Sequence, residues 1–176
     1  MKNLYASLIG IVTLLVVVPL ALAKPPSWDD QINNPSRFQE LEEFGDAAVL
    51  DKEAGLVWDE SPSTDTLTWF DAQARCINLL VGAGVSSARG GWRLPTVQEL
   101  KSLVDPAGIG GPGPVLPPGH PFDNVQSDDY WTATTSALFT DRAWTVTFFN
   151  GVAIFAPKTS MANFWCVRGG QGVDPQ

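Results

Sequence analysis

The stretch that decides the fold lies late in the chain, from Ala143 to Phe155, and reads AWTVTFFNGVAIF. Asn150-Gly151 separates two apolar runs, and this dipeptide favours the tight turn of a β-hairpin because both residues tolerate positive φ. In the first run Trp144, Val146 and Phe148 alternate with threonines, which is the two-residue period of a strand. The stretch therefore predicts an antiparallel hairpin with Trp144 on its core face.

Short apolar runs elsewhere predict further strands. Residues Tyr130–Thr134 precede the hairpin, and Phe164–Arg168 follow it. A second hairpin is predicted at Ala47–Leu50 and Gly55–Trp58, two apolar runs around a polar turn. Strands joined in this way are antiparallel neighbours.

Two helices are predicted between these strands. The first begins at Thr68, a good N-cap with acidic Asp71 three residues on, and it places Trp69, Ala72 and Cys76 on one face. It ends in the glycine-rich stretch 82–91. The combination of helices and antiparallel strands predicts an α+β fold.

The second helix carries a capping box. Thr96 and Glu99 can each bond the other's backbone N–H, and Pro106 is expected to end the helix. Its apolar face consists of Val97, Leu100, Leu103 and Val104. A long loop rich in Gly and Pro follows at residues 107–121.

The N-terminus reads as an export signal. Residues 1–23 combine a basic start, an apolar run and the small-residue site Ala21-Leu22-Ala23, so cleavage before Lys24 is expected. A membrane anchor is the alternative, but the run is shorter than the roughly 20 residues of a spanning helix and contains Pro19. The expected location is periplasmic or secreted, with no stable membrane insertion after cleavage.

The mature chain divides into a polar tether at 24–36, one domain at 37–170 and a tail at 171–176. Loss of Lys2 lowers the formal net charge from −8 to −9. This acidity argues against a nucleic-acid partner. The two cysteines, Cys76 and Cys166, are expected to form a disulfide in an oxidising compartment, with two free buried thiols as the alternative.

Seven stretches of the chain occur in a characteristic order: AVLDKEAGLVW at 48–58, TWFDAQARC at 68–76, GWRLPTVQEL at 91–100, GHPF at 119–122, YWTAT at 130–134, AWTVTF at 143–148 and WCVR at 165–168. Together they resemble the Lcl C-terminal-domain family, a bacterial group of unknown function. The resemblance implies a C-type-lectin-like fold over residues 37–170. For some members it also implies binding of surface carbohydrate or glycosaminoglycan, without one shared ligand.

The chain is also distantly similar to formylglycine-generating enzymes through its Trp-Arg-Leu-Pro segment and Cys-Val-Arg ending. Those enzymes need two cysteines close together near the C-terminus, whereas this chain has Cys166 alone there. Other catalytic motifs are missing as well. We therefore expect no enzyme activity and no cofactor, with such an enzyme as the second alternative.

No metal site is predicted. His120 is the single histidine and has no ligand-spaced partners. The oxygen-rich stretch from Asp123 to Asp129 leaves a calcium ion as an open alternative, although the Glu-Pro-Asn and Trp-Asn-Asp signatures of calcium-dependent lectins are absent.

The expected function is non-catalytic recognition of a glycan or a surface protein. Tryptophans 69, 92, 131, 144 and 165 are assigned to the core, because each lies on a predicted helix or strand face. The ligand face is placed on polar residues of the last hairpin and the loop after it: Arg142, Asn150, Lys158, Thr159, Ser160 and Asn163. The first alternative is a structural protein-interaction domain of the cell envelope.

Overall fold

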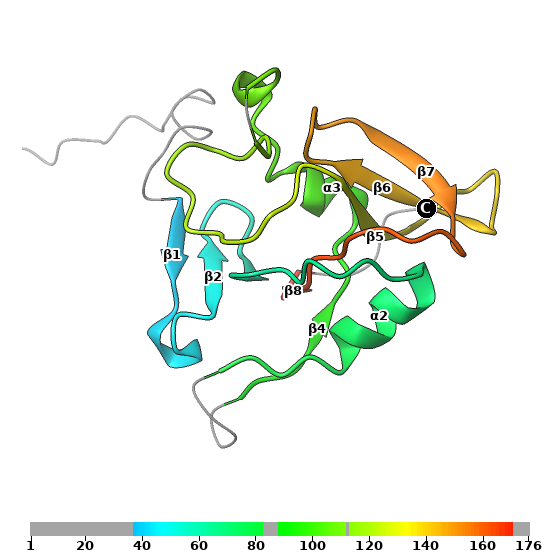
Figure 1. The fold of residues 1–176 in the computed structure, drawn as a ribbon. Coiled ribbons are helices and arrows are strands. Elements are labelled where there is room, and N and C mark those ends of the chain that lie inside the picture. The colour runs from blue at the N-terminus through cyan, green and yellow to red at the C-terminus, as the bar shows by residue number, and fades with distance from the viewer. Residues whose placement is uncertain (1–36, 83–87, 112, 171–176) are drawn as a thin grey trace, which may run out of the picture.

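The computed structural model describes residues 37–82, 88–111 and 113–170. These residues contain two antiparallel sheets and two short α-helices, joined by loops (Figure 1). The predicted α+β class is therefore confirmed. Three predicted segments lie outside these described residues: the signal peptide at 1–23, the tether at 24–36 and the tail at 171–176.

The larger sheet has the strand order β1-β2-β3-β8-β4. Its strands are β1 (Phe38–Glu40), β2 (Ala48–Asp51), β3 (Leu56–Asp59), β4 (Trp92–Arg93) and β8 (Val167–Arg168). The predicted hairpin is β2–β3, and a 3-10 helix, η1 (Glu42–Phe44), joins β1 to β2. β8 is a central strand, because it pairs with β3 on one side and β4 on the other.

The smaller sheet contains β5 (Asp129–Thr135), β6 (Arg142–Thr147) and β7 (Ala153–Pro157) in that order. β6 and β7 are the predicted hairpin, with Trp144 opposite Phe155. Gly151 adopts a φ of 71°, and a side chain there would clash with Val104. This turn therefore needs glycine both for its backbone conformation and for its close approach to Val104.

The first helix, α2 (Trp69–Ile77), begins as predicted, with the Thr68 hydroxyl accepting a bond from the Asp71 N–H. Trp69, Ala72 and Cys76 are buried against the rest of the fold. Because these three residues recur at helical spacing, α2 buries one stripe and leaves the opposite side in solvent.

The second helix, α3 (Val97–Lys101), has the predicted capping box but ends earlier than predicted. Ser102 is its C-cap, and Arg37 Nη2 donates to the Ser102 carbonyl at 2.9 Å. Pro106 does not end α3 but begins a separate 3-10 helix, η2 (Pro106–Gly108). The bond from Arg37 gives a carbonyl at the helix end a partner outside the helix, so the helix can end after little more than one turn.

Two hydrophobic clusters fill the fold. The first contains α2, with Trp92 and Trp131, and the second contains α3, with Trp58 and Trp165. α3 contacts β5 and β6, and its Leu100 lies in the same cluster as Val146. The smaller sheet is therefore covered by α3 at the Val146 end.

Trp144 belongs to neither cluster, and its assignment to the core is corrected. It points to the same side of β6 as Val146, as the alternation predicts, but it is only half-buried, whereas Val146 is fully buried. The other four tryptophans assigned to the core are buried.

Candidate functional site

The polar residues predicted to bind a ligand do not form one surface. Asn163 is buried, and its backbone joins the segment after β7 to β5 through bonds with Trp131 and Asp129. Its expected exposure to solvent is therefore wrong. Asn150 accepts a bond from the Val152 N–H and so stabilises the turn.

Lys158 is held by the fold on several sides. Its ammonium donates to Thr135 Oγ1 and the Thr140 carbonyl, both at 3.0 Å, and lies 4.1 Å from the centre of the Trp69 ring. Thr159 is exposed and Ser160 is half-buried. Of the predicted residues, Arg142 is the one that lies against aromatic rings at the surface, exposed Phe139 and half-buried Phe155.

Arg142 and three aromatic side chains form a surface that we call the aromatic face: Phe139, Arg142, Trp144 and Phe155. The guanidinium carbon of Arg142 lies 5.1 Å from the ring centre of Phe139 and 5.6 Å from that of Phe155. Trp144 meets Phe155 edge-on, with ring centres 5.5 Å apart. Aromatic and cation–π contacts thus hold the three rings and the Arg142 guanidinium next to one another.

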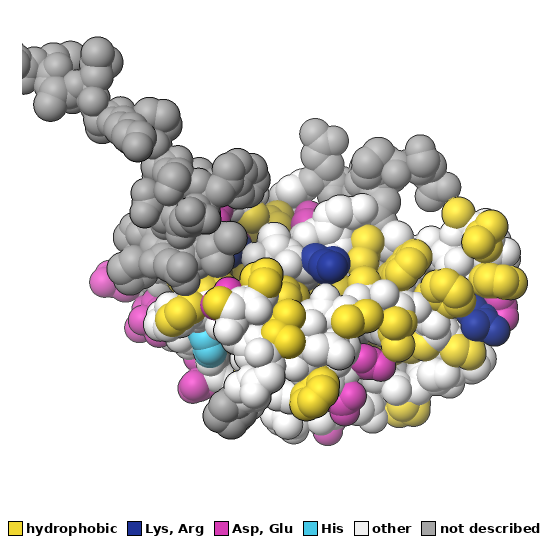
Figure 2. All heavy atoms as spheres, turned by 90° about the horizontal axis from the view of Figure 1, so that it is seen from above, with side chains coloured by type: hydrophobic (Ala, Val, Ile, Leu, Met, Phe, Trp, Pro, Cys, Tyr) yellow, Lys and Arg dark blue, Asp and Glu magenta, His cyan; other side chains and the backbone are white. Residues whose placement is uncertain are grey.

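The aromatic face is partly exposed to solvent, because Arg142, Trp144 and Phe155 are half-buried and Phe139 is exposed. Phe139 is 46% exposed, and the neighbouring Leu138 is 84% exposed. Figure 2 shows hydrophobic side chains gathered on the side of the molecule that carries the smaller sheet. Within the described residues, the buried Arg142 Nε has no hydrogen-bond partner. Aromatic surface combined with a guanidinium is typical of recognition sites.

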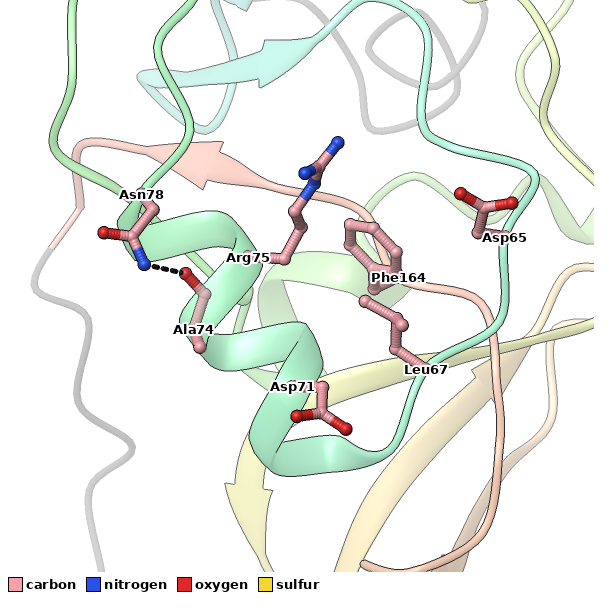
Figure 3. Close-up of a pocket in the computed structure, with 7 residues that line it drawn as sticks. All are labelled: Asp65, Leu67, Asp71, Ala74, Arg75, Asn78 and Phe164. Atoms are coloured by element: carbon pink, nitrogen blue, oxygen red, sulfur yellow. Dashed lines mark hydrogen bonds between the residues drawn. The ribbon is translucent and has the colours of Figure 1, made fainter.

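A second concave region runs along α2 (Figure 3). Its cavity of about 410 Å³ is lined by Arg75, Asp65 and Asp71, with Leu67 and Phe164 as its apolar part. Arg75 extends from the helix into the space beside the loop that carries Asp65. Asp71 accepts a bond from the Thr68 hydroxyl at 2.6 Å, so this carboxylate serves the helix start. The region is shallow and has a mixed polar and apolar lining, and we assign it no ligand.

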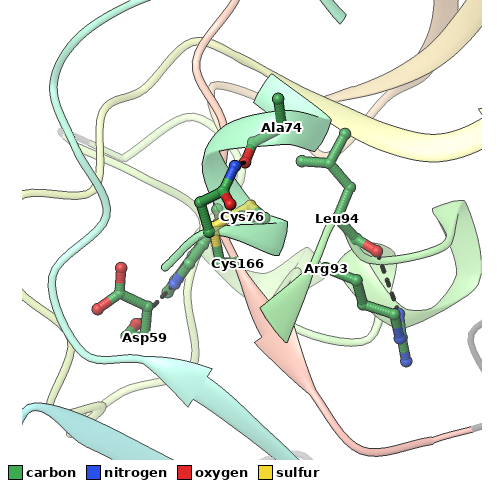
Figure 4. Close-up of a disulfide and its surroundings, with 8 residues drawn as sticks. Asp59, Ala74, Cys76, Arg93, Leu94 and Cys166 are labelled. Carbon is green, nitrogen blue, oxygen red and sulfur yellow. Dashed lines mark hydrogen bonds between the residues drawn. A yellow bond between two sulfur atoms is a disulfide. The ribbon is translucent and has the colours of Figure 1, made fainter. Parts of the chain in front are cut away.

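The predicted disulfide is confirmed and lies next to this region (Figure 4). Cys76 on α2 is bonded to Cys166, which directly precedes β8, with a Cα–Cα distance of 5.4 Å. A cavity of about 250 Å³ beside the bridge is lined by Asp59, Ser61 and Arg75 among others. The Asp59 N–H donates to the Cys166 carbonyl at 3.1 Å.

Burial raises the pKa of the Asp59 carboxyl from 3.8 to about 7. The Ser61 backbone N–H opposes this rise, and the Glu60 carboxylate adds to it. The folded protein therefore binds this proton more tightly than the unfolded chain. The associated stability is present below about pH 4 and is lost as the pH rises through about 7.

Asp59→Asn is expected to remove the pH dependence of stability that arises from the Asp59 carboxyl. The melting temperature of the wild type should fall more steeply between pH 5 and pH 7.5 than that of Asp59→Asn, because an amide does not titrate. Asp65→Asn is the matched control, since Asp65 is exposed in the neighbouring cavity. Parallel melting curves for the wild type and Asp59→Asn would contradict the assigned titration.

Other polar features of the described residues point to no metal centre. No group of three or more His, Cys, Asp and Glu side chains is placed to hold a metal ion in the part of the chain that the structure describes. His120 stacks on Phe122 with ring centres 5.9 Å apart, and burial lowers its pKa. Asn124 donates to Ser61, and Asp128 accepts from the Asp129 N–H. The absence of calcium stays a prediction.

Comparison with known proteins identifies the family. The model of the Lcl C-terminal domain matches residues 47–168, a span that holds both α-helices, the disulfide and every strand except β1. The chain belongs to the Lcl C-terminal domain family. No curated protein matches the chain. The aromatic face lies wholly within the Lcl C-terminal domain.

Among the described residues of 37–170, no helix is long and apolar enough to cross a membrane.

Sequence reasoning missed three members of the aromatic face in this Lcl C-terminal domain: it assigned Trp144 to the core and did not mark Phe155 or Phe139. Phe155 could have been found by counting the hairpin register outward from Asn150-Gly151, which brings it opposite Trp144. Phe139 lies in the loop between β5 and β6, where no periodic pattern marks it. Its place beside Arg142 follows only from the three-dimensional path of that loop.

Proposed function

We propose that this Lcl C-terminal domain is an exported, non-catalytic module that binds a glycan on its aromatic face. The single observation that carries the proposal is the cluster of partly exposed aromatic rings beside the Arg142 guanidinium. Aromatic rings can stack on the apolar C–H face of a sugar ring, and a guanidinium can donate several hydrogen bonds to hydroxyl groups. This surface retains the last hairpin as the binding region but replaces most of its predicted residues.

The aromatic face favours a glycan over a strongly anionic partner. The chain has a formal net charge of −8, so a polyanion would be repelled at long range. The Arg142 guanidinium can donate directional hydrogen bonds, and it makes cation–π contacts with two aromatic rings. A neutral or weakly charged sugar matches this combination. A C-type-lectin-like architecture is part of the proposal, supported by two helices, antiparallel sheets and the bridge from helix to last strand.

The glycan proposal is tested with a glycan array probed by residues 24–176, followed by titration of the best ligand. Trp144→Ala and Arg142→Ala are each expected to weaken binding about tenfold, the loss of roughly 1.4 kcal/mol. Phe70→Ala is the matched control, because Phe70 is a 59% exposed aromatic residue on α2. Circular dichroism should show that all variants are folded.

Two outcomes would contradict glycan binding at this surface. One is a folded wild-type protein that binds no sugar on the array. The other is a sugar whose affinity falls with Phe70→Ala but not with Trp144→Ala or Arg142→Ala.

Export is proposed from residues 1–23, with a periplasmic or secreted location for the product. The disulfide supports this proposal, because such bonds persist in oxidising compartments. N-terminal sequencing of protein recovered from outside the cytoplasm is expected to start at Lys24. A mature product that still begins at Met1 would contradict cleavage.

A further inference from the structure

We propose that two copies of this chain pair along their β7 strands and so join their smaller sheets into one antiparallel sheet. The occupant of the β7 edge is thus a second copy of the same protein. The inference does not rest on glycan binding. It follows from an open strand edge whose hydrogen-bonding groups are complementary to themselves.

The two edges of the smaller sheet differ. On the β5 side, the Trp131 N–H donates to the Asn163 carbonyl at 2.9 Å, and the Asn163 N–H donates to the Asp129 carbonyl at 3.0 Å. The segment after β7 thus covers that edge. On the β7 side, no strand or isolated bridge of the described residues pairs with the strand from outside. Figure 1 shows β7 at the margin of the sheet.

The register fixes which backbone groups face outward. The Thr147 N–H donates to the Val152 carbonyl, and the Lys158 N–H donates to the Asp141 carbonyl. Because strand residues alternate, the backbone groups of Ile154 also point toward β6. The N–H and C=O groups of Ala153 and Phe155 therefore point away from the sheet.

These outward groups match those of a second copy. A two-fold axis through Ile154 brings Ala153 of one copy opposite Phe155 of the other, and the reverse. Each of these pairs can exchange two hydrogen bonds, which makes four in total. The two Ile154 side chains then face each other across the axis as a close, non-hydrogen-bonded pair. Ile154 is 47% exposed in the single chain, so this contact would bury apolar surface.

Charge also favours a second copy at this edge. The segment from Phe149 to Pro157 contains no charged residue, although the chain carries a formal net charge of −8. Two acidic molecules can therefore approach here without placing like charges in contact. Free edges are usually blunted by lysine or proline along the strand. In β7 the one such residue is Pro157, at the strand's end and outside the four-bond pairing.

Sedimentation velocity on residues 24–176 over a range of concentrations tests the proposal. The wild type is expected to show a concentration-dependent dimer. Ile154→Lys should weaken the dimer at least tenfold, because two lysines would meet at the axis. Leu138→Lys is the matched control: it makes the same kind of change at an 84% exposed residue in the loop between β5 and β6, outside the β7 strand, and should leave the dimer intact.

A second variant separates pairing from folding. Ala153→Pro removes one outward N–H and no bond to β6, so it should also favour the monomer while the melting temperature changes little. A wild type that is monomeric at every concentration overturns the proposal. A dimer that survives both edge variants, or one that Leu138→Lys abolishes, overturns it as well, because the interface would then lie elsewhere.

Discussion

Removal of the Cys76–Cys166 disulfide is expected to lower the free energy of unfolding by about 4–5 kcal/mol. The bridge joins residues 90 positions apart, and on the chain-entropy model a loop of this length restricts the unfolded state by that amount. Domains of this size are stable by only about 5–15 kcal/mol. The reduced protein should therefore lie close to its unfolding limit at physiological temperature.

The measurement is urea unfolding followed by tryptophan fluorescence. The variant is the double substitution Cys76→Ala and Cys166→Ala, which leaves no free thiol, and wild type kept in reductant is the comparison. Both should lose similar stability, since both release the same constraint. A loss below about 1 kcal/mol in the two samples would mean that the bridge constrains little in the unfolded chain.

Trp165→Ala is expected to destabilise the fold by about 3–5 kcal/mol, the usual cost of removing a large buried aromatic side chain. Trp165 has no exposed surface and lies at the centre of the second cluster. Its ring centre is 4.8 Å from that of Phe122 and 5.5 Å from that of Trp58. Its Nε1 donates to the Asp59 carbonyl at 2.7 Å, so truncation also leaves a backbone acceptor unpaired.

Trp144→Ala is the matched control for this substitution, because it removes the same side chain from a half-buried position. We expect it to cost about 1 kcal/mol, in line with its partial burial. Trp165→Phe should fall between the two, since it keeps an aromatic ring but loses the bond to Asp59. If Trp144→Ala and Trp165→Ala lowered the free energy of unfolding equally in urea, the assignment of Trp165 but not Trp144 to the core would be contradicted.

Local patterns predicted much of the fold. The hairpin around Asn150-Gly151, the N-cap at Thr68 and the capping box at Thr96 depend on residues close in sequence, and each is present in the structure. Strand β1 was not predicted. Arg37 beside it forms a buried ion pair with Asp51 at 2.6 Å, and such long-range pairing leaves no periodic signal in three residues.

The candidate site was harder to predict, because exposure depends on what covers a residue. The alternation in β6 places Trp144 and Val146 on one face, yet only Val146 packs into the cluster that contains Leu100 of α3, and Trp144 stays half-buried. Asn163 was expected in solvent because the loop around it is polar. Its burial comes from bonds to β5, more than 30 residues earlier, which sequence spacing could not reveal.

The central position of β8 has a consequence for how the protein is made. Its residues are synthesised long after those of β3 and β4, yet they connect these two strands: Val167 pairs with both Trp58 and Arg93. On a nascent chain the disulfide cannot form until Cys166 has emerged, and the larger sheet cannot be completed until Val167 and Arg168 have emerged. Folding of the domain is therefore completed only after nearly all of its residues have been synthesised.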